Sequence, residues 1–170
     1  HFAGLPAEMK RLANLSAKYG FNILEDSAHA LGAKFDNGKK IGSCKYSDIS
    51  VFSLHPVKSI AAGEGGVITT NNHEIYMSLL RLRSHGINKI SDELINKDLG
   101  FTGDKKNLWY YEMKELGYHY RITDIQCALA ISQLRKLDKF ISKRLKLVNY
   151  YRELIEKVDF LSPAQKTKNS

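Results

Sequence analysis

The sequence predicts an α/β protein with three layers, in which strands near residues 22–25, 48–53 and 66–70 carry helices on both faces. The order of the expected elements supports the α/β class, and the composition supports a globular protein. An amphipathic segment over residues 5–19 is followed at once by a short apolar run, which is the helix–strand rhythm of an α/β sheet. Apolar residues make up 43% of the 170 residues and charged residues 26%, a balance typical of a globular protein with a buried core.

The first helix and strand have recognisable boundaries. Within the helix expected over residues 5–19, Pro6 suits the first turn, and Gly20 can adopt the left-handed conformation that ends a helix. The apolar run at residues 21–24 does not alternate with polar residues. We therefore expect it to be a buried parallel strand.

The middle of the chain predicts one helix and one long excursion. Residues 72–83 are expected to form a helix capped by Asn71 or Asn72. Residues 84–114 have weak periodicity and are rich in Gly, Asn, Asp and Lys, so they predict a long loop. Long loops in compact domains often carry function.

A helical pattern returns at Thr123, which together with Gln126 fits a capping box. Apolar residues then recur at intervals of three or four to about Val158, which predicts one long helix or a pair of helices. We therefore divide the chain into residues 1–158, part of one large domain that includes this helical segment, and residues 159–170, a polar tail or linker.

The formal net charge of +8 is compatible with nucleic acid, an anionic membrane or a phosphorylated ligand. More than half of it falls on residues 135–157, where the cations lie off the apolar stripe, so we interpret it as a solvated helix face. No nucleic-acid reader motif accompanies these cations, and no apolar run is long enough to cross a bilayer. We expect neither nucleic acid nor a membrane as a partner.

Cys44 and Cys127 are too few for a disulfide framework or a four-cysteine zinc site. We expect both to be ordinary small residues in a protein of the reducing cytoplasm, and we expect no metal site. Because the chain opens on His1, its start is either processed or not included, and a removed signal peptide stays an open alternative.

Three polar side chains are predicted to meet at one edge of the sheet. Asp26 comes just past one predicted strand and Ser53 ends the next, where open α/β sheets place their ligands. Lys58 follows among apolar neighbours, close to a small-residue turn at residues 63–66, so we expect its amine to be partly desolvated. An acid, a hydroxyl and an amine are the parts of a pyridoxal phosphate site, although each is common by itself.

Three strings of residues contain this cluster or follow it: Glu-Asp-Ser-Ala-His-Ala-Leu-Gly at 25–32, Phe-Ser-Leu-His-Pro-Val-Lys at 52–58 and Gly-Glu-Gly-Gly at 63–66. Together they resemble the DegT/StrS-type sugar aminotransferases, which are fold-type I pyridoxal phosphate enzymes. The branch that makes a pseudaminic acid precursor is similar at residues 83–87, 109–113 and 115–126. The resemblance runs in register over residues 1–160, and it implies the three-layer large domain of that family.

The resemblance implies a role for each residue of the cluster. Lys58 would bind the cofactor covalently and carry the proton during transfer, and Asp26 would pair with the pyridinium nitrogen. Ser53 would bind the cofactor phosphate, and His29 would lie beside the ring and its 3-hydroxyl. The implied reaction has glutamate as the amino donor and a nucleotide-linked 4-keto-6-deoxy sugar as the acceptor.

Other polar residues near these motifs have structural alternatives. Glu25 is expected to be structural or solvent-facing, His55 to be a structural turn residue, and His85 to make a loop hydrogen bond rather than touch substrate. Arg121 has two alternatives. It would bind a carboxylate or a sugar nucleotide, either within its own subunit or across a subunit interface, or it would have no such role. His119 stands where the family has an asparagine that resembles a cross-subunit phosphate ligand, so that contact stays open.

The resemblance also implies that these residues are the central part of a protein more than twice as long. The family supplies a phosphate-binding turn and a stacking aromatic ring before them, and a small domain after them. Exposed sheet edges and apolar faces are then expected to pair with a second copy or with those segments. The alternative hypothesis is a catalytically incompetent remnant that acts only as part of an oligomer.

Overall fold

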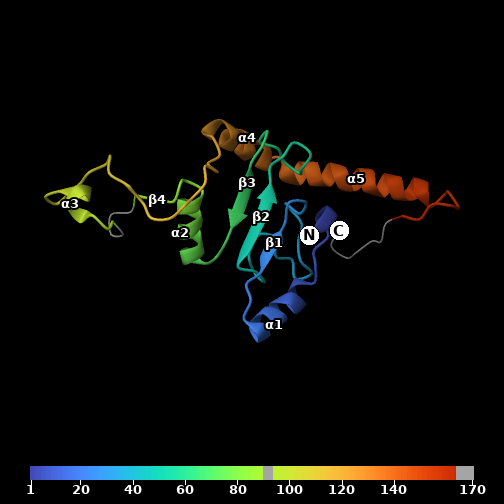
Figure 1. Ribbon diagram of the computed structural model, residues 1–170. Helices are drawn as coiled ribbons and strands as arrows, with labels where there is room; N and C mark the ends of the chain where they lie inside the picture. Colours follow the sequence, from blue (N-terminus) through green and yellow to red (C-terminus); the bar gives the residue numbers. More distant parts are fainter. Residues whose placement is uncertain (90–93, 164–170) are drawn as a thin grey trace. The chain divides into compact units, whose positions relative to one another are not determined.

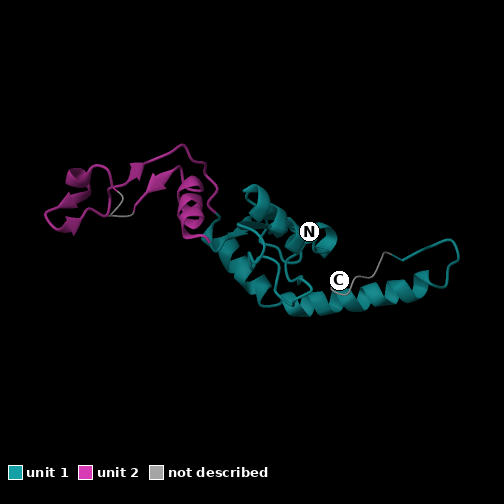
Figure 2. Cartoon of the chain, turned by 90° about the horizontal axis from the view of Figure 1, so that it is seen from below, with its two compact units in different colours: residues 1–71, 122–170 teal, residues 72–121 magenta. Residues whose placement is uncertain are grey.

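The computed structural model describes residues 1–89 and 94–163. The chain forms two compact units, which have different colours in Figure 2. Unit 1 holds residues 1–71 and the chain from Ile122 onward, and unit 2 holds residues 72–121.

Unit 1 is built on a three-stranded sheet in the order β1-β2-β3 (Figure 1). Its strands are β1 (Leu24–Asp26), β2 (Ile49–Ser53) and β3 (Gly66–Thr69). β1 runs parallel to β2, with Asp26 opposite Val51, and β3 runs antiparallel to β2, with Gly66 opposite Ser53. The three predicted strands and the α/β class are confirmed. The parallel pair places the carboxyl ends of β1 and β2 at one edge of the sheet.

The first strand begins later than the sequence predicts, and it is less buried. The amide of Ile23 donates to the side chain of Asp48 (2.7 Å), and the paired register starts at Leu24. The run at residues 21–24 is not a buried strand, since Phe21 is 44% and Leu24 61% exposed. Because side chains alternate along a strand, the buried position of β1 is the next residue, Glu25.

α1 (Met9–Tyr19) ends at Gly20, which adopts the predicted left-handed conformation with φ 73°. It begins four residues after the predicted start. The amide of Ala7 donates to Nδ1 of His1 (3.0 Å), and this contact holds the preceding segment outside the helix. A short 3₁₀ turn, η1 (Phe2–Gly4), lies before that segment.

The second half of unit 1 is a pair of helices, α4 (Asp124–Leu134) and α5 (Leu137–Ile155). The predicted capping box is confirmed: Thr123 Oγ1 accepts the Gln126 amide (3.2 Å), and Gln126 Oε1 accepts the Thr123 amide (3.1 Å). The sequence left open one long helix or a pair of helices, and the chain forms the pair. Within the predicted tail, residues 164–170 lie outside the described residues.

Two hydrophobic clusters form the core of unit 1. β2 contributes to the first cluster, and the residue just after β2 contributes to the second. Phe52 lies in the first cluster, and Leu54, two residues further on, lies in the second. The first cluster also contains Met9, Ala30, Phe35 and Ile41, and the second contains Ile60, Ala62 and Leu137. The second cluster packs the segment after β2 against the start of α5.

Unit 2 begins with α2 (His73–Leu82), and its cap is Asn72, whose side chain accepts the amides of Glu74 (2.8 Å) and Ile75 (3.1 Å). The predicted loop over residues 84–114 contains short elements instead. They are β4 (Ile87–Asn88), α3 (Lys97–Gly100), β5 (Phe101–Thr102), β6 (Lys105–Lys106) and β7 (Glu112–Met113). β4 pairs with β7 and β5 with β6, each antiparallel. Strands of two residues have no periodicity, so the sequence does not distinguish them from a loop.

Candidate active site

The carboxyl ends of β1 and β2 bring two predicted site residues to one edge of the sheet. Asp26 is the last residue of β1 and is exposed, and Ser53 is the last residue of β2 and is half-buried. In the parallel register Asp26 faces Val51, two residues before Ser53. Both polar side chains therefore end neighbouring strands on the same edge.

Buried hydroxyl groups hold the end of β1. The Ser27 amide donates to the Val51 carbonyl (2.9 Å), and Ser27 Oγ lies 2.7 Å from Ser50 Oγ, with both serines fully buried. On the exposed side, Asp26 Oδ1 accepts the Ala28 amide (3.0 Å). These contacts fix the backbone after Asp26 and orient its carboxylate, which stays open to solvent.

The neighbouring carboxylate points the other way. Glu25 is 3% exposed, and its Oε2 lies 3.0 Å from Nε2 of His1. Because Nδ1 of His1 accepts the Ala7 amide, the proton of the neutral ring lies on Nε2 and is donated to Glu25. The structural role expected for Glu25 is confirmed, and the solvent-facing alternative is wrong. Sequence reasoning missed the partner, which lies 24 residues away.

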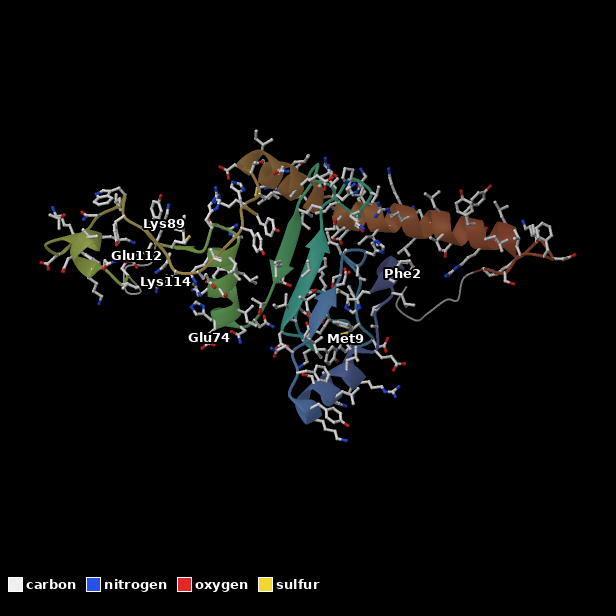
Figure 3. All side chains as sticks on the ribbon, in the orientation of Figure 1. Phe2, Met9, Glu74, Lys89, Glu112 and Lys114 are labelled. Atoms are coloured by element: carbon white, nitrogen blue, oxygen red, sulfur yellow. The ribbon has the colours of Figure 1, made fainter. Side chains whose placement is uncertain are left out.

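His29 lies in the turn that follows Asp26. Its Nδ1 accepts the Ala3 amide (3.3 Å), and its ring centroid is 5.4 Å from that of Phe2, which Figure 3 labels. With Nδ1 as the acceptor, Nε2 carries the proton of the neutral ring. The exposed imidazole therefore presents an N–H donor next to the Asp26 strand end.

A tight turn carries the chain from Ser53 to Lys58. Ser53 Oγ accepts the His55 amide (3.3 Å), and the His55 carbonyl accepts the Lys58 amide (2.9 Å). The His55 ring contributes as well, since its Nδ1 accepts the Val57 amide (3.2 Å). The prediction that His55 is a structural turn residue is confirmed.

The Lys58 side chain is half-buried. Of the apolar residues near Lys58 in the sequence, Ile60 is buried (4% exposed) and Val57 is exposed (75%). Lys58 therefore has apolar surroundings on one side only. Lys58 lines a cavity of about 290 Å³ together with Pro56, Ser59, Ile60, Ala61, Gln133, Phe140 and Arg144. Among the described residues, the side chains that line this cavity include two cations and no acid.

The predicted small-residue turn needs its glycines. Gly63 has φ +83° and Gly65 has φ +142°, conformations that other residues rarely adopt. A Cβ atom on Gly65 would lie 2.9 Å from Cδ1 of Ile122. The Gly65 carbonyl accepts the Leu54 amide (2.8 Å), so the turn returns the chain beside the end of β2.

Unit 2 holds the remaining predicted site residues close to one another. His119 forms a β-bridge with Ser84, and Arg121 donates to Ser84 Oγ (3.0 Å). The His119 ring meets the His85 ring edge-on, with centroids 5.2 Å apart. The His85 amide donates to the Tyr118 carbonyl (2.9 Å), which fixes the backbone of this loop, and the role expected for the His85 ring stays a prediction.

Glu112 forms a polar centre in unit 2 that the sequence did not indicate. Its carboxylate accepts the amides of Ile95 and Asn96 (both 2.7 Å) and the hydroxyl of Tyr110 (3.0 Å), and Figure 3 labels it. The two amide hydrogen bonds lower the pKa of the Glu112 carboxyl. The pKa of the Tyr110 hydroxyl is raised, mainly by desolvation and secondly by the hydrogen bond to Glu112. Backbone partners carry no sequence signature, which is why sequence reasoning missed this centre.

Within residues 1–89 and 94–163, no group of three His, Cys, Asp or Glu residues is placed to hold a metal ion. Cys44 and Cys127 form no disulfide. No helix in the described part of the chain combines the length and the apolar character needed to span a membrane.

Known proteins resemble this chain in both sequence and fold. The DegT/DnrJ/EryC1/StrS aminotransferase family matches residues 1–170. A UDP-4-amino-4,6-dideoxy-N-acetyl-beta-L-altrosamine transaminase of Campylobacter jejuni is 41% identical over 161 residues, which are 95% of this chain and 38% of that protein. The chain therefore spans about 38% of the length of this relative.

Two solved structures extend the comparison. Helicobacter pylori PseC, an aminotransferase involved in the biosynthesis of pseudoaminic acid, has a TM-score of 0.77 at 32% identity over 91% of this chain and 36% of that one. A putative sugar aminotransferase of Streptococcus pneumoniae in its PLP form has a TM-score of 0.75 at 25% identity over 99% of this chain and 43% of that one.

These likenesses confirm the expected fold class, because the structural neighbours are aminotransferases of this α/β type. They also confirm the expected cofactor class, since the family consists of pyridoxal phosphate enzymes. The chain belongs to the DegT/DnrJ/EryC1/StrS aminotransferase family.

Proposed function

We propose that the protein carrying this chain uses pyridoxal phosphate to move an amino group from glutamate to a nucleotide-linked 4-keto-6-deoxy sugar. The observation that carries the proposal is the shared edge of β1 and β2, where Asp26, Ser53 and the turn to Lys58 come together. Family membership supports the reaction type. The names of the Campylobacter jejuni and Helicobacter pylori relatives support the substrate class.

The side chains at this edge fit pyridoxal phosphate. Asp26 offers an exposed carboxylate, and Oδ2 accepts no hydrogen bond from the described residues, so it can accept one from a protonated ring nitrogen. Ser53 offers a hydroxyl for the phosphate, His29 an N–H beside the ring, and Lys58 an amine. When bound, the cofactor supplies an aldehyde carbon that carries the amino group and a ring that withdraws electrons from it.

Each of these residues then has its own task. Lys58 Nζ holds the cofactor between turnovers and moves the proton during each transfer. The negative charge of Asp26 keeps the ring nitrogen protonated, and the Ala28 amide aims its carboxylate. In unit 2, His119 and Arg121 present exposed nitrogen atoms for anionic groups of the sugar nucleotide or of a cofactor bound by a neighbouring subunit.

The assembly is part of the same proposal. Residues 1–158 contribute to the cofactor-binding large domain, residues 159–170 form a tail or linker, and the chain works in the cytoplasm as a homodimer or with further segments of the protein. Large apolar side chains that are exposed on the sheet and on α5 support this association, among them Val67, Ile68, Leu147 and Tyr151.

Amino transfer can be tested on the purified protein that carries this chain. Protein incubated with pyridoxal phosphate is given ¹⁵N-glutamate and a UDP-linked 4-keto-6-deoxy sugar, and the products are identified by mass spectrometry. We expect 2-oxoglutarate and ¹⁵N-labelled amino sugar from the native chain and neither from Lys58→Ala. Lys45→Ala, which removes an exposed lysine outside the site, is the matched control.

The outcomes separate the two functional hypotheses. Cofactor binding without either product would contradict the assignment of donor and acceptor. A chain that neither binds pyridoxal phosphate nor forms product would favour the alternative, a remnant that acts only as part of an oligomer.

A further inference from the structure

Two side chains of the helix pair reach the stretch of chain that carries Lys58, residues 54–66, which we name the Lys58 segment. Gln126, in the first turn of α4, donates from Nε2 to the carbonyl of Glu64 (3.0 Å). Arg144, in α5, donates from its guanidinium to the carbonyl of Lys58 itself (3.4 Å). The partners are 62 and 86 positions apart in the sequence. The helix pair therefore contacts the Lys58 segment at two separate points.

Apolar packing also joins the Lys58 segment to the helix pair. Ile60 and Ala62 are buried in one cluster with Leu137, the first residue of α5, and Phe140 packs against that cluster. Phe140 and Arg144 lie one helical turn apart, so one face of α5 supplies both an apolar contact and a hydrogen-bond donor. The same two residues line the cavity beside Lys58.

Both hydrogen bonds are accepted by main-chain carbonyls, so they constrain the backbone of the Lys58 segment and not the lysine amine. A hydrogen bond to the Lys58 carbonyl fixes the position of the backbone from which the side chain extends, and it leaves the amine itself unoccupied. A hydrogen bond to the Glu64 carbonyl fixes the far arm of the turn, next to Gly65.

We propose that Gln126 and Arg144 are positioning residues that clamp the Lys58 segment and so set where the Lys58 amine is presented. The importance of Lys58 rests on the proposed function, whereas the clamp is a property of this chain with or without a cofactor. Because reacting groups must be held within a small distance of each other, a loosened segment is expected to slow any reaction of the amine.

The chain offers variants that remove each donor with little other change. Gln126→Glu keeps an oxygen for the Thr123 amide, so the capping box survives, but it cannot donate to the Glu64 carbonyl. Arg144→Met keeps an aliphatic stem without the donor, and Arg144→Lys restores a charged donor. Lys143→Met removes an exposed charge from the neighbouring position and serves as the control.

Hydrogen exchange tests the clamp without any cofactor. In peptides covering residues 54–66, we expect Gln126→Glu and Arg144→Met each to speed amide exchange about tenfold, the worth of one hydrogen bond of roughly 1.4 kcal/mol. Arg144→Lys should recover most of the protection, and Lys143→Met should match the native chain. Unchanged circular dichroism would show that both loss variants fold. Native exchange rates in both of them would overturn the proposal.

A second measurement tests whether the clamp serves Lys58. Each variant is incubated with pyridoxal phosphate and reduced with borohydride at successive times, and peptide mass spectrometry compares the adduct at Lys58 with that at Lys45. We expect the two loss variants to react several-fold more slowly at Lys58, Arg144→Lys to recover, and Lys45 to be unaffected. Native rates at Lys58 in variants whose exchange has increased would reduce the contacts to a structural role and overturn the proposal.

Failure of the underlying function would look different. A native chain that forms no adduct at Lys58 contradicts the proposed cofactor site, while the exchange experiment still decides whether Gln126 and Arg144 hold the Lys58 segment.

Discussion

Glu25 and Asp26 are adjacent carboxylates with opposite surroundings. Strand alternation sends Asp26 to the exposed edge and Glu25 into the interior, where the Glu25 carboxylate accepts a hydrogen bond from Nε2 of His1. The positions of Asp26, Ser53 and Lys58 could be predicted because they follow from local strand ends and a turn. The His1–Glu25 and Glu112 contacts could not, because each joins segments that are distant in sequence or uses backbone amides.

The hydrogen bond between the buried hydroxyls of Ser27 and Ser50 can be tested by single and double substitutions. Ser27→Ala would leave the buried Ser50 hydroxyl without its partner, at a cost of about 1–3 kcal/mol. The double variant removes both polar groups, so it should cost less than the sum of the two single changes. Urea unfolding followed by circular dichroism measures these losses. Strictly additive losses would show that the two hydroxyls do not act as a pair.

Three helix boundaries were predictable from the sequence, although the start of α1 was not. Gly20, Asn72 and the Thr123–Gln126 box act on residues within one turn, so the sequence contains the whole interaction. The start of β1 depends instead on a contact between Ile23 and the distant Asp48. The short strands of residues 84–114 are set by pairing rather than by hydrophobic pattern, which is why the sequence predicted a loop there.

The glycine turn before β3 provides a matched pair of substitutions. Gly65→Ala faces both an unfavourable backbone (φ +142°) and a contact of 2.9 Å with Ile122, whereas a Cβ atom on Gly63 would meet nothing within 4 Å. We expect Gly63→Ala to cost about 1 kcal/mol and Gly65→Ala about 1–3 kcal/mol more. Thermal or urea unfolding compares them. Equal losses would contradict the packing of Ile122 against this turn.

The Glu112 contacts predict a pH response in unit 2. Because the pKa of Glu112 is lower in the folded chain, its carboxylate stabilises this region above the ordinary carboxyl range, and that contribution is lost as the pH falls through the folded-state pKa. The amide chemical shifts of Ile95 and Asn96 should therefore titrate with a midpoint below the ordinary pKa of a glutamate carboxyl. Glu112→Gln should abolish this titration. A midpoint at or above the ordinary value would contradict the assigned hydrogen bonds.

At the scale of the molecule, exposed apolar surface is the main feature. Leu147, Tyr151 and Leu154 recur at helical spacing on α5 and are 58%, 62% and 41% exposed. Such a stripe favours association. Sedimentation velocity over a range of concentrations should therefore detect species heavier than the 19.3 kDa chain. Leu147→Gln should weaken the association and the neighbouring Lys146→Gln should not, whereas a 19.3 kDa species at every concentration would contradict it.

We propose that one sheet edge and the Lys58 segment together form a pyridoxal phosphate site. The most direct measurement is the site-resolved map of lysines modified when the chain, saturated with pyridoxal phosphate, is reduced with borohydride and digested. We expect one dominant adduct at Lys58, strongly reduced in Asp26→Ala. Modification spread evenly over the exposed lysines, with Lys58 no more reactive than Lys45, would contradict it.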